Sequence, residues 1–229
     1  MRGKMKVRNK LSAILIIIMI IGMLAGCGSR VDVSAYVKSI LDVRYKNDST
    51  TYVEMKFGTE EEAEKAYNEG MDKIVNEFVK NLGISEEMTK EYRQILADVS
   101  ASVKYTVGEA VKQEDGSYLV NVTYEKMNLF VPFEKRYKAA ITAAIQDWIA
   151  EMTAQGTVEF TQEEMEIMMN RLMFETMAEC LKDTLAEVTW QEPQTATVTV
   201  TVKNRTLHAD EQDLEALDKL FYDGEEADR

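Results

Sequence analysis

The segment YTVGEAVKQEDGSYLVNVTY, from Tyr105 to Tyr124, alternates apolar and polar side chains on both sides of the turn-forming sequence EDGS. A period of two is typical of strands that bury one face, and a short turn containing glycine joins such strands into a hairpin. A shift of one residue would turn the tyrosines and valines into water, so the pattern also specifies the register. We therefore predict a β-hairpin over 103–125, with an apolar face that carries Val103, Tyr105, Val107, Tyr118, Val120, Val122 and Tyr124.

A second alternating segment, TATVTVTVKN from Thr195 to Asn204, places valines on one side and threonines on the other. We expect this strand, residues 195–203, to join the hairpin in one antiparallel sheet, with its threonine side toward solvent. Strands and helices are segregated along the chain, which favours an α+β fold over a doubly wound sheet. The predicted fold class is therefore α+β, with helices packed on one face of a small antiparallel sheet.

Helical periodicity accounts for most of the remaining sequence. Thr59 with Glu62, and Thr161 with Glu164, have the spacing of capping boxes, and Ser85 precedes a further apolar-periodic segment. Helices are expected over 33–45, from Thr59 to a stop at Gly83, from Ser85 to about Ala101, from Pro132 to a stop at Gly156, over 162–187 and after Asp210. Residues 46–58 are expected to form a loop with a short extended piece.

The first ten residues, MRGKMKVRNK, carry five basic side chains and no acid, and an apolar run over 11–25 follows them. A charged start, a short apolar run and small residues before a cleavage site are typical of a secretory signal. The run is shorter than the ~20 residues that a spanning helix needs. We predict a signal peptide over 1–26, a short tether over 27–32 and a single domain over 33–229, with an uncleaved anchor as the alternative.

Leu24, Ala25, Gly26 and Cys27 resemble the lipobox of bacterial lipoproteins at all four positions. In that family the cysteine thiol receives diacylglycerol, and cleavage then leaves it as the first residue. The resemblance implies a lipid anchor at Cys27, with the membrane as partner and the outer face of the cell membrane as location. Each buried CH2 group of an acyl chain contributes roughly 0.8 kcal/mol to such anchoring. A disulfide between Cys27 and Cys180 is the alternative use of this cysteine.

The run from Tyr105 to Met127, together with the later valine strand, resembles small uncharacterised lipoproteins of Gram-positive bacteria. Some of these are described as cone-shaped domains like that of nuclear transport factor 2, so the resemblance implies a cone-like sheet covered by helices. It covers most of the mature chain as a pattern and brings no motif of known activity with it. The long helix predicted over 162–187 departs from the simple cone.

Charge narrows the range of partners. The predicted signal holds five of the 27 basic residues and none of the 40 acids, so the mature chain of 203 residues carries a charge of −18, against −13 for the precursor. Such a surface argues against nucleic acid, which is bound through Lys and Arg on its phosphates. It also argues against a domain that lies flat on anionic lipid. We expect the lipid to hold the protein and the domain to stay off the bilayer.

Residues with catalytic or metal-binding chemistry are scarce. His208 is the only histidine, at a position expected to be solvated, and Cys180 lies on a methionine-rich helical face, which favours a buried, inert thiol. No calcium-loop spacing and no glycine-rich phosphate loop occurs. We predict no catalytic residue, no metal and no cofactor. The methionine stripe is expected to pack in the core rather than bind copper, and consists of Met165, Met168, Met169, Met173 and Met177.

Aromatic residues are the candidates for a ligand pocket, because the hairpin and a helix expected to cover it both carry them. The predicted function is a non-catalytic binding or interaction domain at the outer face of the membrane, for an unidentified small molecule or protein. A cell-envelope hydrolase with paired carboxylates is one alternative. A structural or regulatory partner of a membrane complex is the other. The candidate ligand-binding residues are Tyr105, Tyr118, Tyr124, Tyr137 and Trp148.

Overall fold

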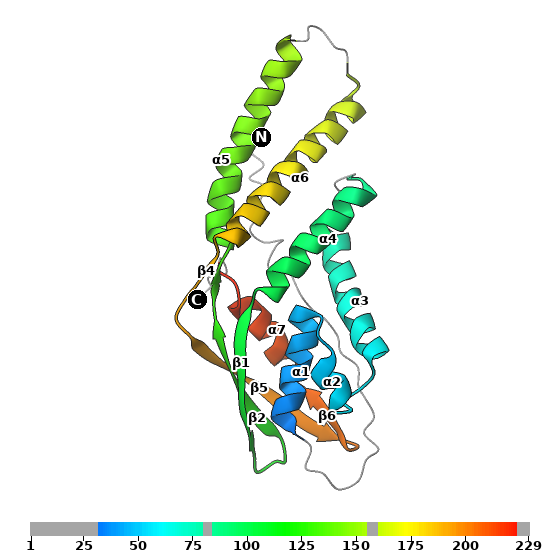
Figure 1. Ribbon diagram of the computed structural model, residues 1–229, viewed down its shortest axis with the longest axis vertical. Coiled ribbons are helices and arrows are strands. Elements are labelled where there is room, and N and C mark those ends of the chain that lie inside the picture. Colours follow the sequence, from blue (N-terminus) through cyan, green and yellow to red (C-terminus); the bar gives the residue numbers. More distant parts are fainter. Residues whose placement is uncertain (1–31, 80–83, 155–159, 224–229) are drawn as a thin grey trace.

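The computed structural model describes residues 32–79, 84–154 and 160–223, and its fold is α+β, as predicted (Figure 1). The predicted signal, Cys27 and most of the tether lie outside the described residues, as do the predicted helix stops at Gly83 and Gly156. The helices are α1 (Val33–Lys46), α2 (Thr50–Glu54), α3 (Glu60–Val79), α4 (Glu86–Ala101), α5 (Phe130–Ala154), α6 (Gln162–Ala186) and α7 (Glu211–Leu220). The strands are β1 (Lys104–Lys112), β2 (Tyr118–Glu125), β3 (Met127–Asn128), β4 (Thr189–Trp190), β5 (Gln194–Lys203) and β6 (Thr206–Ala209).

The predicted hairpin is confirmed as β1 and β2, with Tyr105 opposite Tyr124. Its turn closes through two backbone bonds, from Gly116 N to Gln113 O at 3.1 Å and from Gln113 N to Ser117 O at 2.8 Å. Gly116 has a φ of +87°, which only glycine adopts without strain. A type I turn followed by such a glycine matches the twist of the two strands, so the sequence EDGS specifies the hairpin locally.

The predicted third strand is also confirmed, since β5 pairs antiparallel with β2 and sets Val198 opposite Val120. Both valines are fully buried. A fourth strand, β6, was not predicted, and it completes the order β1-β2-β5-β6. It pairs with β5 across Asn204 and Arg205, whose φ values of 52° and 67° make a two-residue turn. Asn204 was the residue from which this turn could have been predicted, because asparagine adopts a positive φ more readily than most residues.

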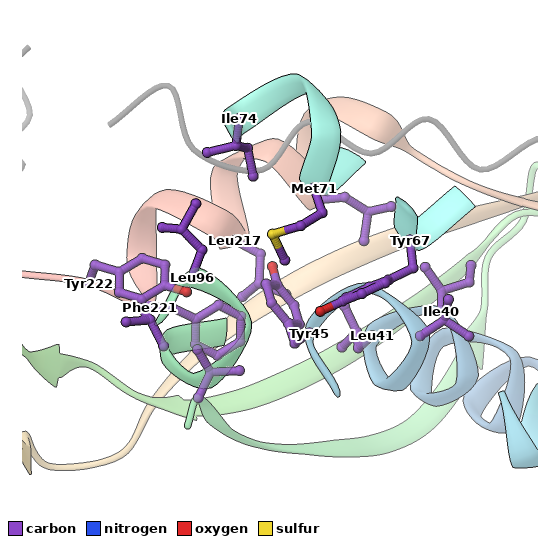
Figure 2. Close-up of a cluster of buried hydrophobic side chains, with 14 of the residues drawn as sticks. Ile40, Leu41, Tyr45, Tyr67, Met71, Ile74, Leu96, Leu217, Phe221 and Tyr222 are labelled. Carbon is purple, nitrogen blue, oxygen red and sulfur yellow. The ribbon is translucent and has the colours of Figure 1, made fainter. Parts of the chain in front are cut away.

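Helix α1 lies against the apolar face of the sheet and is itself covered by α3 and α4 (Figure 1). Val37 and Leu41 of α1 are therefore completely buried, and so is Met71 of α3. Figure 2 shows side chains of α3, α4 and the C-terminal segment gathered around Tyr45 at the end of α1. We call the four-stranded sheet together with α1, α3 and α4 the body, and its core has three layers with α1 in the middle.

The prediction of a loop over 46–58 is wrong in one respect, because this segment contains the short helix α2. The Asp48 carboxylate accepts a hydrogen bond from Thr50 N at 2.9 Å at the start of this helix. Tyr52 is buried and packs near Phe57, with ring centroids 6.4 Å apart. Tertiary packing therefore stabilises a helix that is too short to show a periodic pattern in sequence.

Helices α5 and α6 form an antiparallel pair that projects from the body (Figure 1). Helix α5 begins at Phe130 rather than at Pro132 as predicted, because the Asp223 carboxylate caps it. Asp223 accepts bonds from the backbone N–H groups of Leu129 at 2.9 Å, of Phe130, and of Val131 at 3.0 Å. The capping box of Thr161 and Glu164 at the start of α6 is confirmed.

Replacement of Asp223 by alanine removes these three hydrogen bonds from the start of α5. We expect the free energy of unfolding, measured by urea denaturation, to fall by about 1–2 kcal/mol, as for the loss of other helix caps. Glu114→Ala, which removes an exposed carboxylate in the hairpin turn, is the control and should change it by less than about 0.5 kcal/mol. Equal stability of Asp223→Ala and wild type would contradict the cap.

Candidate functional site

A buried ion pair joins α1 to α7. Arg44 and Asp218 are 2% and 5% exposed, and Arg44 Nε donates to Asp218 Oδ1 at 3.0 Å while its Nη2 pairs with Oδ2. The Tyr45 hydroxyl also donates to Asp218. Burial raises the pKa of Asp218 to about 6, against the opposing effect of the Arg44 charge. The carboxylate is therefore mostly ionised at pH 7.5 and serves to neutralise the buried guanidinium.

The hairpin tyrosines Tyr105 and Tyr124 lie in a packed aromatic cluster around Phe221. The ring centroid of Phe221 is 5.9 Å from Tyr105, 5.8 Å from Tyr124 and 4.9 Å from Tyr45. The Tyr105 hydroxyl donates to Asp42 at 2.7 Å, and burial raises the pKa of Tyr105 far above its usual value. These rings fill the space between the hairpin and α1, where the sequence predicted a ligand pocket.

The other three candidate residues lie elsewhere. Tyr118 shares the apolar face of β2 with Tyr124, but it is six residues away along the strand, or about 20 Å. Tyr137 and Trp148 are on α5, which packs on α6 and not on the hairpin as expected. The structure therefore brings Tyr105 and Tyr124 together and separates Tyr118, Tyr137 and Trp148 from them.

The described surface includes two open clefts of similar volume. A cleft of about 450 Å³ lies between α1, α3 and α4, and Asp98 is the carboxylate in its lining. A second cleft of about 440 Å³ lies at the base of α5 and α6, where Glu187 is the lining carboxylate and pairs with Arg136 at 2.6 Å. Neither cleft presents the two carboxylates that the hydrolase alternative requires. No cluster of potential metal ligands occurs among residues 32–79, 84–154 and 160–223.

Cys180 is buried as predicted, and burial raises the pKa of its thiol. His208 lies on β6 opposite Thr201 and is half-buried. The prediction that the methionine stripe packs in the core is wrong for its N-terminal part. Met165 is 42% exposed, and Met168 and Met169 are half-buried. The spacing showed that these methionines share a helix face, but it could not show that no other helix within residues 32–79, 84–154 and 160–223 covers this face.

Among the residues that the structure describes, no third element forms a layer on the outer halves of α5 and α6. In α6 every buried residue lies at or after Phe174, and in α5 the buried residue is Phe133, near its start. We call residues 141–154 of α5 and 162–173 of α6 the outer arm. Ile149 is 52% exposed and Ile167 is 51% exposed, although isoleucine is usually buried. Contiguous exposed apolar surface is typical of interaction sites, which makes the outer arm a candidate for one.

Exposed carboxylates lie beside the apolar side chains on both helices of the outer arm. There are five of them, and Arg171, the one basic side chain in these two segments, pairs with Glu175 at 2.7 Å. The outer arm is therefore an apolar surface with an acidic border, and it is the candidate functional site. The five acidic residues are Asp147, Glu151, Glu163, Glu164 and Glu166.

The sequence matches no protein-family model and no curated protein. Among solved structures, the fold is similar to that of "a putative lipoprotein (ycdA)" from Bacillus subtilis, with a TM-score of 0.50 and 13% sequence identity. The similarity covers 83% of this chain and 55% of that protein, so the chain spans about half the length of its structural neighbour. At this identity the similarity concerns the fold alone. No helix in the described parts of the chain is long and apolar enough to cross a membrane.

Removal of one partner of the buried ion pair should be strongly destabilising. We expect Asp218→Ala to lower the free energy of unfolding by about 3–5 kcal/mol, because it leaves the Arg44 charge buried without its carboxylate. The double variant Arg44→Met/Asp218→Leu should lose less than Asp218→Ala alone, as measured by urea denaturation. A single variant that loses under about 1 kcal/mol would contradict this role.

Proposed function

We propose that this protein is a lipid-anchored lipoprotein of the outer face of the cell membrane, and that it acts as a non-catalytic interaction domain. The exposed apolar surface of the outer arm is the observation that carries the interaction role. The lipobox-like sequence ending at Cys27 supports the anchor, and so does the description of the structural neighbour as a lipoprotein.

The position of α1 relative to the arm supports this arrangement. Near the start of α1, the Tyr36 hydroxyl donates to Leu207 O of β6 at 2.9 Å. At its other end, Tyr45 packs on Phe221, whose carbonyl accepts from Met127 N at 2.7 Å just before α5. The first described residues and the outer arm therefore lie at opposite ends of the long axis (Figure 1).

The tether is too short to allow much freedom. Asp32, the N-cap of α1, is five positions after Cys27, and an extended chain of that length spans at most about 18 Å. A lipid at Cys27 would hold the sheet end of the domain close to the membrane and leave the outer arm directed away from it. The arm then has access to partners that the body does not reach.

Metabolic labelling with an alkyne-bearing fatty acid tests the anchor. We expect the wild-type chain to take up the label and Cys27→Ala to lose it, because Cys27 is the proposed acceptor. Cys180→Ala is the matched control and should retain the label, since the Cys180 thiol is buried. Full labelling of Cys27→Ala, or loss of labelling in Cys180→Ala, would contradict the proposal.

Photo-crosslinking in intact cells tests the interaction role. A photoreactive amino acid at Ile149, in the outer arm, should give discrete adducts with another protein. The same amino acid at Thr197, which is exposed on the solvent side of β5, should give none. Absence of adducts from Ile149, or an equal yield from both positions, would show that the arm is not the interaction element.

A further inference from the structure

Each helix of the outer arm carries one apolar stripe. The stripes have the spacing of a single helix face, and both continue from the contact between α5 and α6 out to solvent. None of the residues in them is fully buried, because two helices alone leave each stripe half open. The stripe of α5 consists of Ile141, Ile145, Trp148, Ile149 and Met152, and that of α6 of Met165, Met168, Met169, Leu172 and Met173.

The inner part of α6 shows how a third helix buries the apolar face of this helix. Closer to the body, α4 packs on α6 as a third helix, with the rings of Tyr92 and Phe174 at 6.3 Å. There Phe174, Ala178 and Leu181 are buried to 3% exposure or less. The apolar residues of α6 are therefore buried where α4 packs on them and become exposed beyond the end of α4. A further helix laid against the outer arm would complete the layer in the same way.

The chemistry of the outer arm selects the kind of helix. Methionine is flexible and polarisable, so a methionine-rich surface adapts to varied apolar side chains. An amphipathic helix binds an apolar surface of this kind through apolar residues spaced three and four apart. The five exposed carboxylates on the border then favour Lys and Arg on the polar side of that helix, and disfavour an acidic one.

Two other occupants fit less well. A second copy of this chain would bring the same acidic border against itself, and the whole chain carries a formal charge of −13. An anionic lipid surface meets the same repulsion. We infer that the outer arm binds a basic amphipathic helix of a partner protein, along the exposed apolar stripes of α5 and α6; this inference rests on the proposed function and names the partner of that same site.

A designed peptide tests the inference. The full chain in mild detergent, with Trp190→Phe so that Trp148 is the remaining tryptophan, is titrated with a Leu/Lys peptide of ~18 residues patterned as an amphipathic helix. We expect saturable binding, a blue shift of Trp148 fluorescence, and at least tenfold weaker binding when salt is raised from about 0.05 to 0.5 M. A scrambled peptide of the same composition and a Leu/Glu amphipathic peptide should not bind.

Matched variants distinguish binding to the apolar stripes from a general electrostatic attraction. Met168→Gln/Leu172→Gln should weaken binding at least tenfold, and Glu163→Gln/Glu166→Gln severalfold, with unchanged circular dichroism. Glu60→Gln/Glu61→Gln removes the same charge from the exposed start of α3 and should have no effect. Equal binding of the scrambled peptide, or an equal effect of the α3 variant, would overturn the inference.

The remaining outcomes are also decisive. No binding of the Leu/Lys peptide, together with cellular adducts from Ile149, would leave the interaction role standing and reject a basic helix as partner. Peptide binding without any cellular adduct would leave the binding chemistry of the outer arm standing and reject the proposed function. Self-association that Ile149→Glu abolishes would assign the outer arm to a second copy of this chain and overturn the inference.

Discussion

The ion pair between Arg44 and Asp218 links the first described helix to the last, and the arrangement of the other elements depends on that link. It fixes α7 against α1, and the residues that follow α7 are then fixed as well. Phe221 enters the aromatic cluster beneath α1, and Asp223 reaches the start of α5. A buried pair of this kind adds little net stability by itself, but the loss of either partner is costly. It therefore specifies one arrangement of α1, α7 and the base of the arm.

The contrast between body and arm has a single cause, which is the number of packed layers. In the body, α1 is enclosed by the sheet on one side and by α3 and α4 on the other, so even Asp42 and Arg44 are buried. In the outer arm, the two helices pack on each other and on no third helix of the described residues, so their apolar stripes stay half open. Domains ordinarily bury each apolar face against another element. The outer arm does not, and this makes it the site of interaction in our account.

The features predicted correctly from sequence are local ones. The alternation around EDGS specifies β1 and β2, the threonine–valine repeat specifies β5, and Thr161 with Glu164 specifies the start of α6. The features that were missed depend on distant residues. The start of α5 is set by Asp223, which is more than 90 positions away, and α2 is stabilised by the burial of Tyr52.

The candidate site shows the same division. Helical spacing correctly predicted that the methionines share one helix face. It did not show that the N-terminal methionines of α6 lie outside the core, or that the helix of Trp148 packs on α6 instead of on the hairpin. Whether a stripe is covered depends on how far α4 extends along α6, which periodicity does not reveal. The acidic border was visible only as part of a generally acidic composition, because its members come from two helices.

Amide hydrogen exchange tests the central claim most directly, since it reports the local stability of each segment. The full chain would be compared as purified protein and within the cell envelope. The account predicts that outer-arm amides exchange faster than those of α1 in the purified protein, and that they become selectively protected in the envelope. Equal exchange of the outer arm in both settings would contradict the claim that this surface is where the protein meets its partner.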